Sequence, residues 1–130
     1  MDFIDRLYEA VETLNLEFPL KIGVLDEAES VSIHAMGGQT IKSYYDGVKT
    51  KQLNYEFSIK TRKQEQAFKT LNAIANHLSD VEDIPSENDS YTFEQVRITD
   101  EAFLVRQDDK GHLFYCFAIQ VRLTIFNKER

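Results

Sequence analysis

The stretch "LFYCFAIQVRLTI", residues 113–125, decides the fold, because every odd-numbered position in it is apolar. Successive side chains of a strand point to opposite faces of a sheet, so this alternation predicts a long strand with one face in the core. The even-numbered face, which starts at His112, is only half apolar. We therefore expect the chain itself or a partner to cover that face in part.

Two amphipathic helices are predicted upstream of this strand. In residues 2–15 the apolar positions recur at helical spacing: Phe3, Ile4, Leu7, Tyr8, Val11 and Leu14. The second helix should begin at Thr61, because Thr61 and Gln64 have the spacing of a capping box, and should end before Pro85. Its apolar positions are Ala67, Phe68, Leu71, Ile74, Ala75 and Leu78.

Further strands are predicted on either side of the second helix. "LKIGVL" (20–25) and "SVSIHAM" (30–36) are short candidates joined by the acidic turn 26–29, and Gly37-Gly38 indicates another turn. Tyr91 and Phe93 share one parity and Val96 and Ile98 the other, which predicts a bulge near Glu94-Gln95. "AFLVRQ" (102–107) is a separate candidate before the turn "DDKG" (108–111).

These elements predict a single α+β domain over residues 1–130. Two helices would pack on a mainly antiparallel sheet, in the order α-β-β-β-α-β-β-β. A chain of 130 residues with 42% hydrophobic content can bury a core without disulfides or metal.

A hairpin is predicted over residues 43–60, around Asp46-Gly47. A two-residue turn would place Thr40 opposite Leu53, which is a poor partner for a core leucine. An odd-numbered loop or a glycine bulge would instead place Ile41 opposite Leu53 and Tyr45 opposite Lys49, and we expect this register.

The tip of this hairpin should then project from the body and form a candidate assembly surface. Its residues are Lys42, Tyr44, Tyr45, Asp46, Gly47, Lys49 and Lys51. Tyrosine supplies contact area at small entropic cost, and lysine attracts an acidic neighbour. An ordinary exposed hairpin with amphipathic tyrosines would have the same sequence.

The charge of the chain argues against sequence-independent nucleic-acid binding. The net charge is −7, whereas such binding needs clustered lysine and arginine against phosphates. The distribution is uneven: residues 31–79 carry three acidic and seven basic side chains, and residues 80–101 carry eight acidic and one basic. These blocks are either solvated faces or opposite patches that meet between subunits.

No residue pattern indicates catalysis, a cofactor or a metal. His34, His77 and His112 share no ligand spacing, and Cys116 would lie about 13 Å from His112 along a strand. Asp108-Asp109 and "DVED" (80–83) are more typical of solvated turns than of a calcium loop. The single cysteine suits a reducing cytoplasm, and no apolar run or basic leader predicts membrane insertion or secretion.

The order of motifs resembles one family over residues 2–126. After a short N-terminal helix come "GGQTIKSYYDGVKTKQLNYEFSIKT", the helix "QAFKTLNAIANHL", "SYTFEQV" and "FLVRQDDKGHLFYCFAIQVRLTI". This arrangement is similar to the small minor capsid or tail-terminator proteins of long-tailed phages and prophages of Gram-positive hosts. Asn54 stands where many relatives would have proline.

The resemblance implies a structural virion protein rather than an enzyme. Members assemble as a ring, commonly a hexamer, on the finished tail tube. The ring would stop tube growth and join the tail to the head connector, so its partners are other copies of itself, the tail tube protein and the head-connector protein. DNA would slide through the ring, which suits an acidic protein that does not hold phosphates. Another neck or minor capsid component is the first alternative, and a small-ligand module the second.

Overall fold

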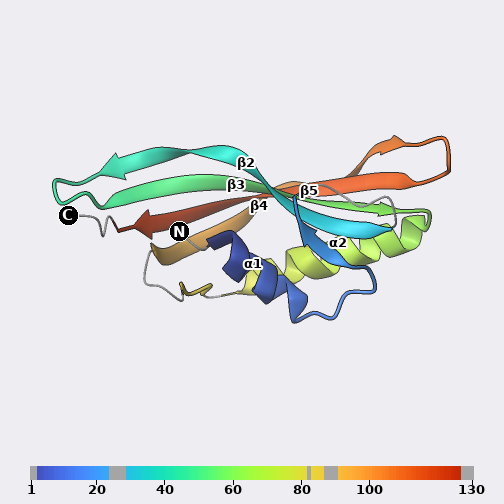
Figure 1. The fold of residues 1–130 in the computed structure, drawn as a ribbon, viewed down its shortest axis with the longest axis horizontal. Coiled ribbons are helices and arrows are strands. Elements are labelled where there is room, and N and C mark those ends of the chain that lie inside the picture. The colour runs from blue at the N-terminus through green and yellow to red at the C-terminus, as the bar shows by residue number, and fades with distance from the viewer. Residues whose placement is uncertain (1–2, 24–28, 82, 87–90, 127–130) are drawn as a thin grey trace.

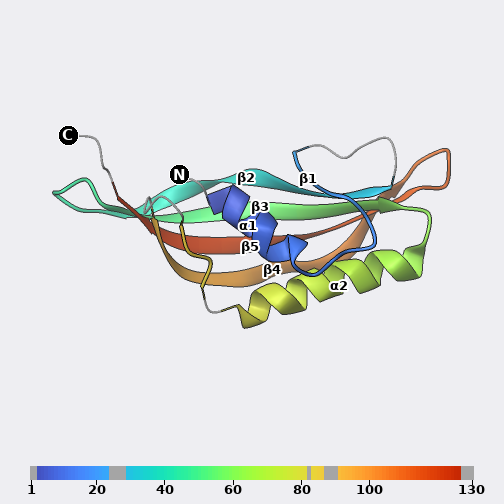
Figure 2. The same cartoon turned by 60° about the horizontal axis from the view of Figure 1, so that its bottom comes forward.

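The computed structural model describes residues 3–23, 29–81, 83–86 and 91–126. The elements are α1 (Phe3–Glu12), β1 (Leu20–Ile22), β2 (Ser30–Ser43), β3 (Lys49–Thr61), α2 (Gln64–Asp80), β4 (Tyr91–Gln107) and β5 (Leu113–Ile125). The strands form one sheet in the order β1-β2-β3-β5-β4, antiparallel except for the β1–β2 pair. Both helices lie on the same face of the sheet (Figures 1 and 2). The predicted α+β class is confirmed.

The predicted order α-β-β-β-α-β-β-β contains one strand too many after the second helix. β4 runs unbroken from Tyr91 to Gln107, so "AFLVRQ" is its second half and no separate strand. The core-facing apolar residues of β4 change from odd to even positions, and register shifts along the strand accommodate this change. The first shift, between Phe93 and Gln95, confirms the predicted bulge. The predicted turn at 26–29 and the loop at 85–90 fall mostly outside the described residues.

Gly37 and Gly38 lie inside β2, so the predicted turn there is wrong. Gly37 has a φ of +98° at a register shift between Ala35 and Gly37, which is a bulge that favours glycine. A Cβ on Gly38 would lie 2.4 Å from the backbone oxygen of Gln52. The two glycines therefore let β2 bend and lie closely against β3.

The hairpin exists, but the expected register, with Ile41 opposite Leu53 and Tyr45 opposite Lys49, is wrong. Leu53 pairs with Gly38, and Thr40 pairs with Lys51. Ile41 falls at a second register shift, between Thr40 and Lys42, and its side chain is exposed. The prediction counted residues back from the turn without allowing for the two register shifts in β2.

The core lies between the helices and one face of the sheet. The odd-numbered residues of β5 from Tyr115 to Leu123 are buried, as predicted. The Phe57 and Phe117 rings stack at 4.9 Å between centroids, and the Phe3 ring of α1 lies 5.6 Å from that of Tyr55. The other buried helix residues are Leu7, Val11, Ala67, Thr70, Leu71, Ile74 and Leu78.

The second helix begins three residues later than predicted. α2 starts at Gln64, and its N-cap, Lys63, makes no side-chain capping bond. Thr61 is instead the last residue of β3, where its buried side chain hydrogen-bonds to the carboxylate of Glu29. The Thr61 oxygen also accepts from the N–H of Lys63 at 3.1 Å. The capping-box interpretation is nevertheless wrong, because Thr61 belongs to β3 and the helix begins only at Gln64.

Candidate assembly surface

The turn between β2 and β3 projects at one end of the long axis of the molecule (Figure 1). The N–H of Tyr44 donates to the carbonyl of Val48 at 2.9 Å, and the N–H of Gly47 donates to the carbonyl of Tyr44 at 3.1 Å. An Asp46 carboxylate oxygen accepts from the N–H of Val48 at 3.1 Å. Gly47 has a φ of +87°, a conformation that glycine adopts without strain. The sequence Asp46-Gly47 thus makes a defined turn.

The two tyrosines at this tip are exposed to different degrees. Tyr45 is fully exposed and Tyr44 is half exposed. With Asp46, Val48 and Thr124 they line an open hollow of about 580 Å³. An amphipathic ring beside a shallow hollow is a feature of protein contact surfaces more than of catalytic sites.

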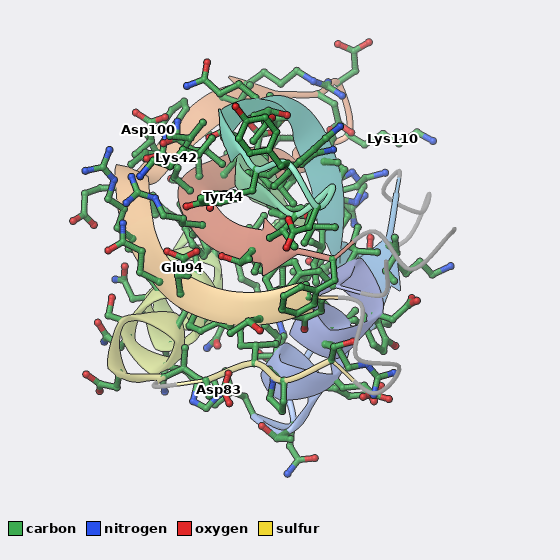
Figure 3. The ribbon with its side chains drawn as sticks, turned by 90° about the vertical axis from the view of Figure 1, so that its left-hand side faces the viewer. Lys42, Tyr44, Asp83, Glu94, Asp100 and Lys110 are labelled. Atoms are coloured by element: carbon green, nitrogen blue, oxygen red, sulfur yellow. The ribbon has the colours of Figure 1, made fainter. Side chains whose placement is uncertain are left out.

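The lysines of the predicted surface divide between the two faces of the sheet. Lys42 pairs with Thr50. Its Nζ lies 6.0 Å from the centroid of the Tyr44 ring, so Lys42 and Tyr44 belong to the same contact surface (Figure 3). Lys49 and Lys51 share the parity of Leu53 and therefore lie on the helix-covered face, beyond α1. The structure thus brings together Lys42, Tyr44, Tyr45, Asp46 and Gly47, and sets Lys49 and Lys51 apart.

Sequence reasoning missed Val48 and Thr124 as neighbours of the tyrosines. Thr124 comes close because it pairs with Thr50 in the β3–β5 ladder. That register depends on the whole sheet, and no local pattern in the sequence indicates it. The exposed run Phe103, Leu104 and Val105, near the opposite end of the molecule, was also missed.

Asp108 and His112 of the β4–β5 turn have a structural role. An Asp108 carboxylate oxygen accepts from the N–H groups of Lys110 and His112, and the other lies 3.0 Å from Nδ1 of His112. Partial burial raises the pKa of the Asp108 carboxyl, but these hydrogen bonds outweigh it, so that the pKa lies below its ordinary value. Asp108 therefore holds the turn as a carboxylate.

Nothing in the described part of the chain assembles a metal or nucleophile site. Among the described residues no three His, Cys, Asp or Glu side chains gather as metal ligands, although Glu82 of "DVED" lies outside them. Burial, with a smaller effect of Glu56, raises the pKa of the Cys116 thiol to about 11. Such a thiol is a poor nucleophile at neutral pH. No described helix has the length and apolarity needed to span a membrane.

Comparison with known proteins decides the family. The model of the family described as bacteriophage tail terminator protein matches residues 15–125, which include every strand and α2. The chain belongs to this family. It is therefore a structural phage tail protein and a component of the virion. The family is not one of known enzymes.

A solved structure has a similar fold. A chain from the virion of a native gene transfer agent particle superposes with a TM-score of 0.60 over 91% of this chain and 84% of that chain. The two sequences are only 11% identical, so the likeness shows a shared fold. No match was found among curated proteins.

Proposed function

We propose that this terminator protein forms a ring, of six copies in its finished state, on the end of the completed tail tube. The ring stops further addition of tube subunits and presents the surface to which the head connector binds. The family match over residues 15–125 is the observation that carries this proposal. The protein acts at the head–tail junction of the virion, after assembly in the cytoplasm of the bacterial host.

The surface chemistry agrees with this role. A ring needs heterologous contacts, in which one patch of each copy meets a different patch of the next. The tip that carries Lys42, Tyr44 and Tyr45 lies at one end of an elongated molecule, so it can reach a neighbour or the tube. The net charge of −7 suits a passage along which DNA slides without binding.

Electron microscopy of particles made without the protein tests the role. A phage that lacks a terminator should make tails longer than the parent, because tube growth has no stop. Normal-length tails without heads would instead assign the protein to another part of the neck. As a control for effects on neighbouring genes, the protein is expressed from a plasmid in the same host. This expression should restore the parental tail length.

A further inference from the structure

The second half of β2 has one free edge. β1 pairs only with Val31, Ser32 and Ile33, whereas β3 pairs with β2 along its full length. From Ala35 to Ser43 no described strand lies on the other side of β2, and these residues are exposed. An edge of this length has unpaired backbone N–H and C=O groups, and it contains neither proline nor an acidic residue that would block pairing.

The opposite edge of the sheet, β4, is also open. Among described strands β4 pairs with β5 alone. Register shifts interrupt β4 on either side of Gln95–Ile98, so this four-residue stretch pairs regularly, as Tyr91–Phe93 does before the first shift. In β2, the shifts after Ala35 and after Thr40 likewise bound the regular stretch Gly37–Thr40.

These two regular stretches lie at the same level along the strand direction, in the same rows of paired residues across the sheet. Gly37 pairs with Asn54, Asn54 with Gln120, and Gln120 with Arg97. By the same ladders, Gln39 lies in the row of Gln95. If copies stand side by side at equal height, the regular part of one edge therefore meets the regular part of the other.

The charges beside these stretches are complementary. Lys42 lies in the row of Thr124, through its partner Thr50. Glu94 lies at the register shift between Phe93 and Gln95. Its carboxylate accepts a hydrogen bond from the hydroxyl of Thr124, so this carboxylate reaches the row of Lys42 on the same face of the sheet. Figure 3, which views the hairpin end, shows Lys42 on β2 and Glu94 on β4. Opposite charges across paired strands stabilise the pair, and like charges destabilise it.

We propose that the free edge of β2, residues 35–43, pairs with residues 91–98 of β4 in a second copy of this chain. β2 and β4 run in opposite directions within the sheet, and rotation about a ring axis along the strands preserves direction. The junction is therefore antiparallel and continues the sheet from copy to copy. This inference rests on the proposed ring, and it names the surface that closes it.

Cross-linking of single-cysteine additions tests the pairing. Gln39→Cys and Gln95→Cys place exposed thiols on the same face of the two edges, while the native Cys116 is buried. A mixture of the two variants, treated with a short bismaleimide alone and with tail tubes, should give cross-linked dimers. A chain that carries both substitutions should give a ladder of oligomers. The matched control pairs Gln39→Cys with Lys110→Cys, at the far hairpin, and should give none.

Two results would overturn the inference. Absence of the mixed cross-link, both alone and with tail tubes, means that the edges do not meet. Cross-linking of Gln39→Cys with itself means that β2 pairs with β2 about a two-fold axis. Sedimentation of the parent protein with tail tubes is recorded in parallel. If a ring forms without the mixed cross-link, the strand pairing is wrong but the proposed function stands. If no ring forms, the proposed function is wrong as well.

A charge exchange provides a second test. Lys42→Glu or Glu94→Lys alone should each raise the concentration needed for assembly by about two- to fivefold per contact. The double variant, in which each contact again joins opposite charges, should return toward the parent. Lys110→Glu, also exposed, controls for net charge. Failure of the double variant to recover would contradict the pairing of Lys42 with Glu94 across the junction.

Discussion

At the scale of single residues, the alternation in β5 separates core from surface. Phe117 is almost fully buried and stacks on Phe57, whereas Gln120 on the other face hydrogen-bonds to Arg97. We expect Phe117→Ala to lower the free energy of unfolding by about 3–5 kcal/mol, because it leaves a cavity. Gln120→Ala should cost less than about 1 kcal/mol. Urea titration of both variants checks this, and equal costs would contradict the assignment of faces.

Gly38 is required for steric reasons. An added Cβ would lie 2.4 Å from the Gln52 carbonyl oxygen, which belongs to the backbone and cannot easily move. Gly38→Ala should therefore cost about 2 kcal/mol or more, through displacement of β2 from β3. Gly23 is the matched control, because it has a φ of +104° but open space around it, and its change to alanine should cost about 1 kcal/mol. Thermal unfolding of both variants measures the two losses of stability. A larger loss for the Gly23 variant than for the Gly38 variant would contradict the close packing at Gly38.

Cys116 should be protected from reagents in the folded protein. With a pKa of about 11, it has about one thiolate in a thousand molecules at pH 8, and its side chain is buried. We expect labelling by a disulfide reagent to be slow in buffer and rapid in urea. The labelling rate in buffer should rise with pH toward 11. Rapid labelling at pH 8 without urea would mean that the outer face of β5 is open.

At the scale of elements, periodicity predicted both helices and β5 but failed where bulges occur. Apolar side chains occupy every odd-numbered position of Leu113–Ile125 without interruption. Only a strand within a sheet places all of these apolar side chains on one buried face. In β2 and β4 the parity changes without a break in the strand, since bulges absorb the extra residues. Gly37-Gly38 has the composition of a turn, and only pairing with β3 makes it part of a strand. A capping threonine was misassigned at Thr61 because its partner, Glu29, is distant in sequence.

The β2–β3 hairpin should contribute to assembly more than to folding. The double substitution Lys49→Glu, Lys51→Glu should leave the melting temperature nearly unchanged, because charges near the surface contribute little to stability. Lys49 and Lys51 lie on the other face from Lys42 but at the same projecting end of the molecule (Figure 1). Their reversal should therefore weaken ring formation or tail binding, most clearly at low salt, where charges are least screened. Melting and sedimentation of the variant with tail tubes, in low and high salt, measure both effects.

The control for this prediction is a single charge reversal at the opposite end of the molecule. Lys110→Glu reverses an exposed lysine beside the β4–β5 turn and should leave assembly as in the parent. An assembly profile of the double variant that equals the parent at every salt concentration would mean that the hairpin lysines serve no contact.

At the scale of the whole molecule, sequence reasoning reached the family but only part of the surface. The order of helices and strands is encoded in local patterns, and the family match rests on that order. The predicted surface included Lys49 and Lys51, yet the register sets these residues on the other face from Lys42. The free edges of β2 and β4 were not predictable, because they depend on the strand order and on how short β1 is.

The most direct test of the central claim is the mass of the protein bound to tail tubes. Purified protein is mixed with tubes that lack a terminator, the complexes are separated from free protein, and the copies per tube end are measured. We predict one ring at the tube end, of six copies, and no further growth when tube protein is added. Binding along the whole tube, or tubes that continue to grow with the protein bound, would contradict the account.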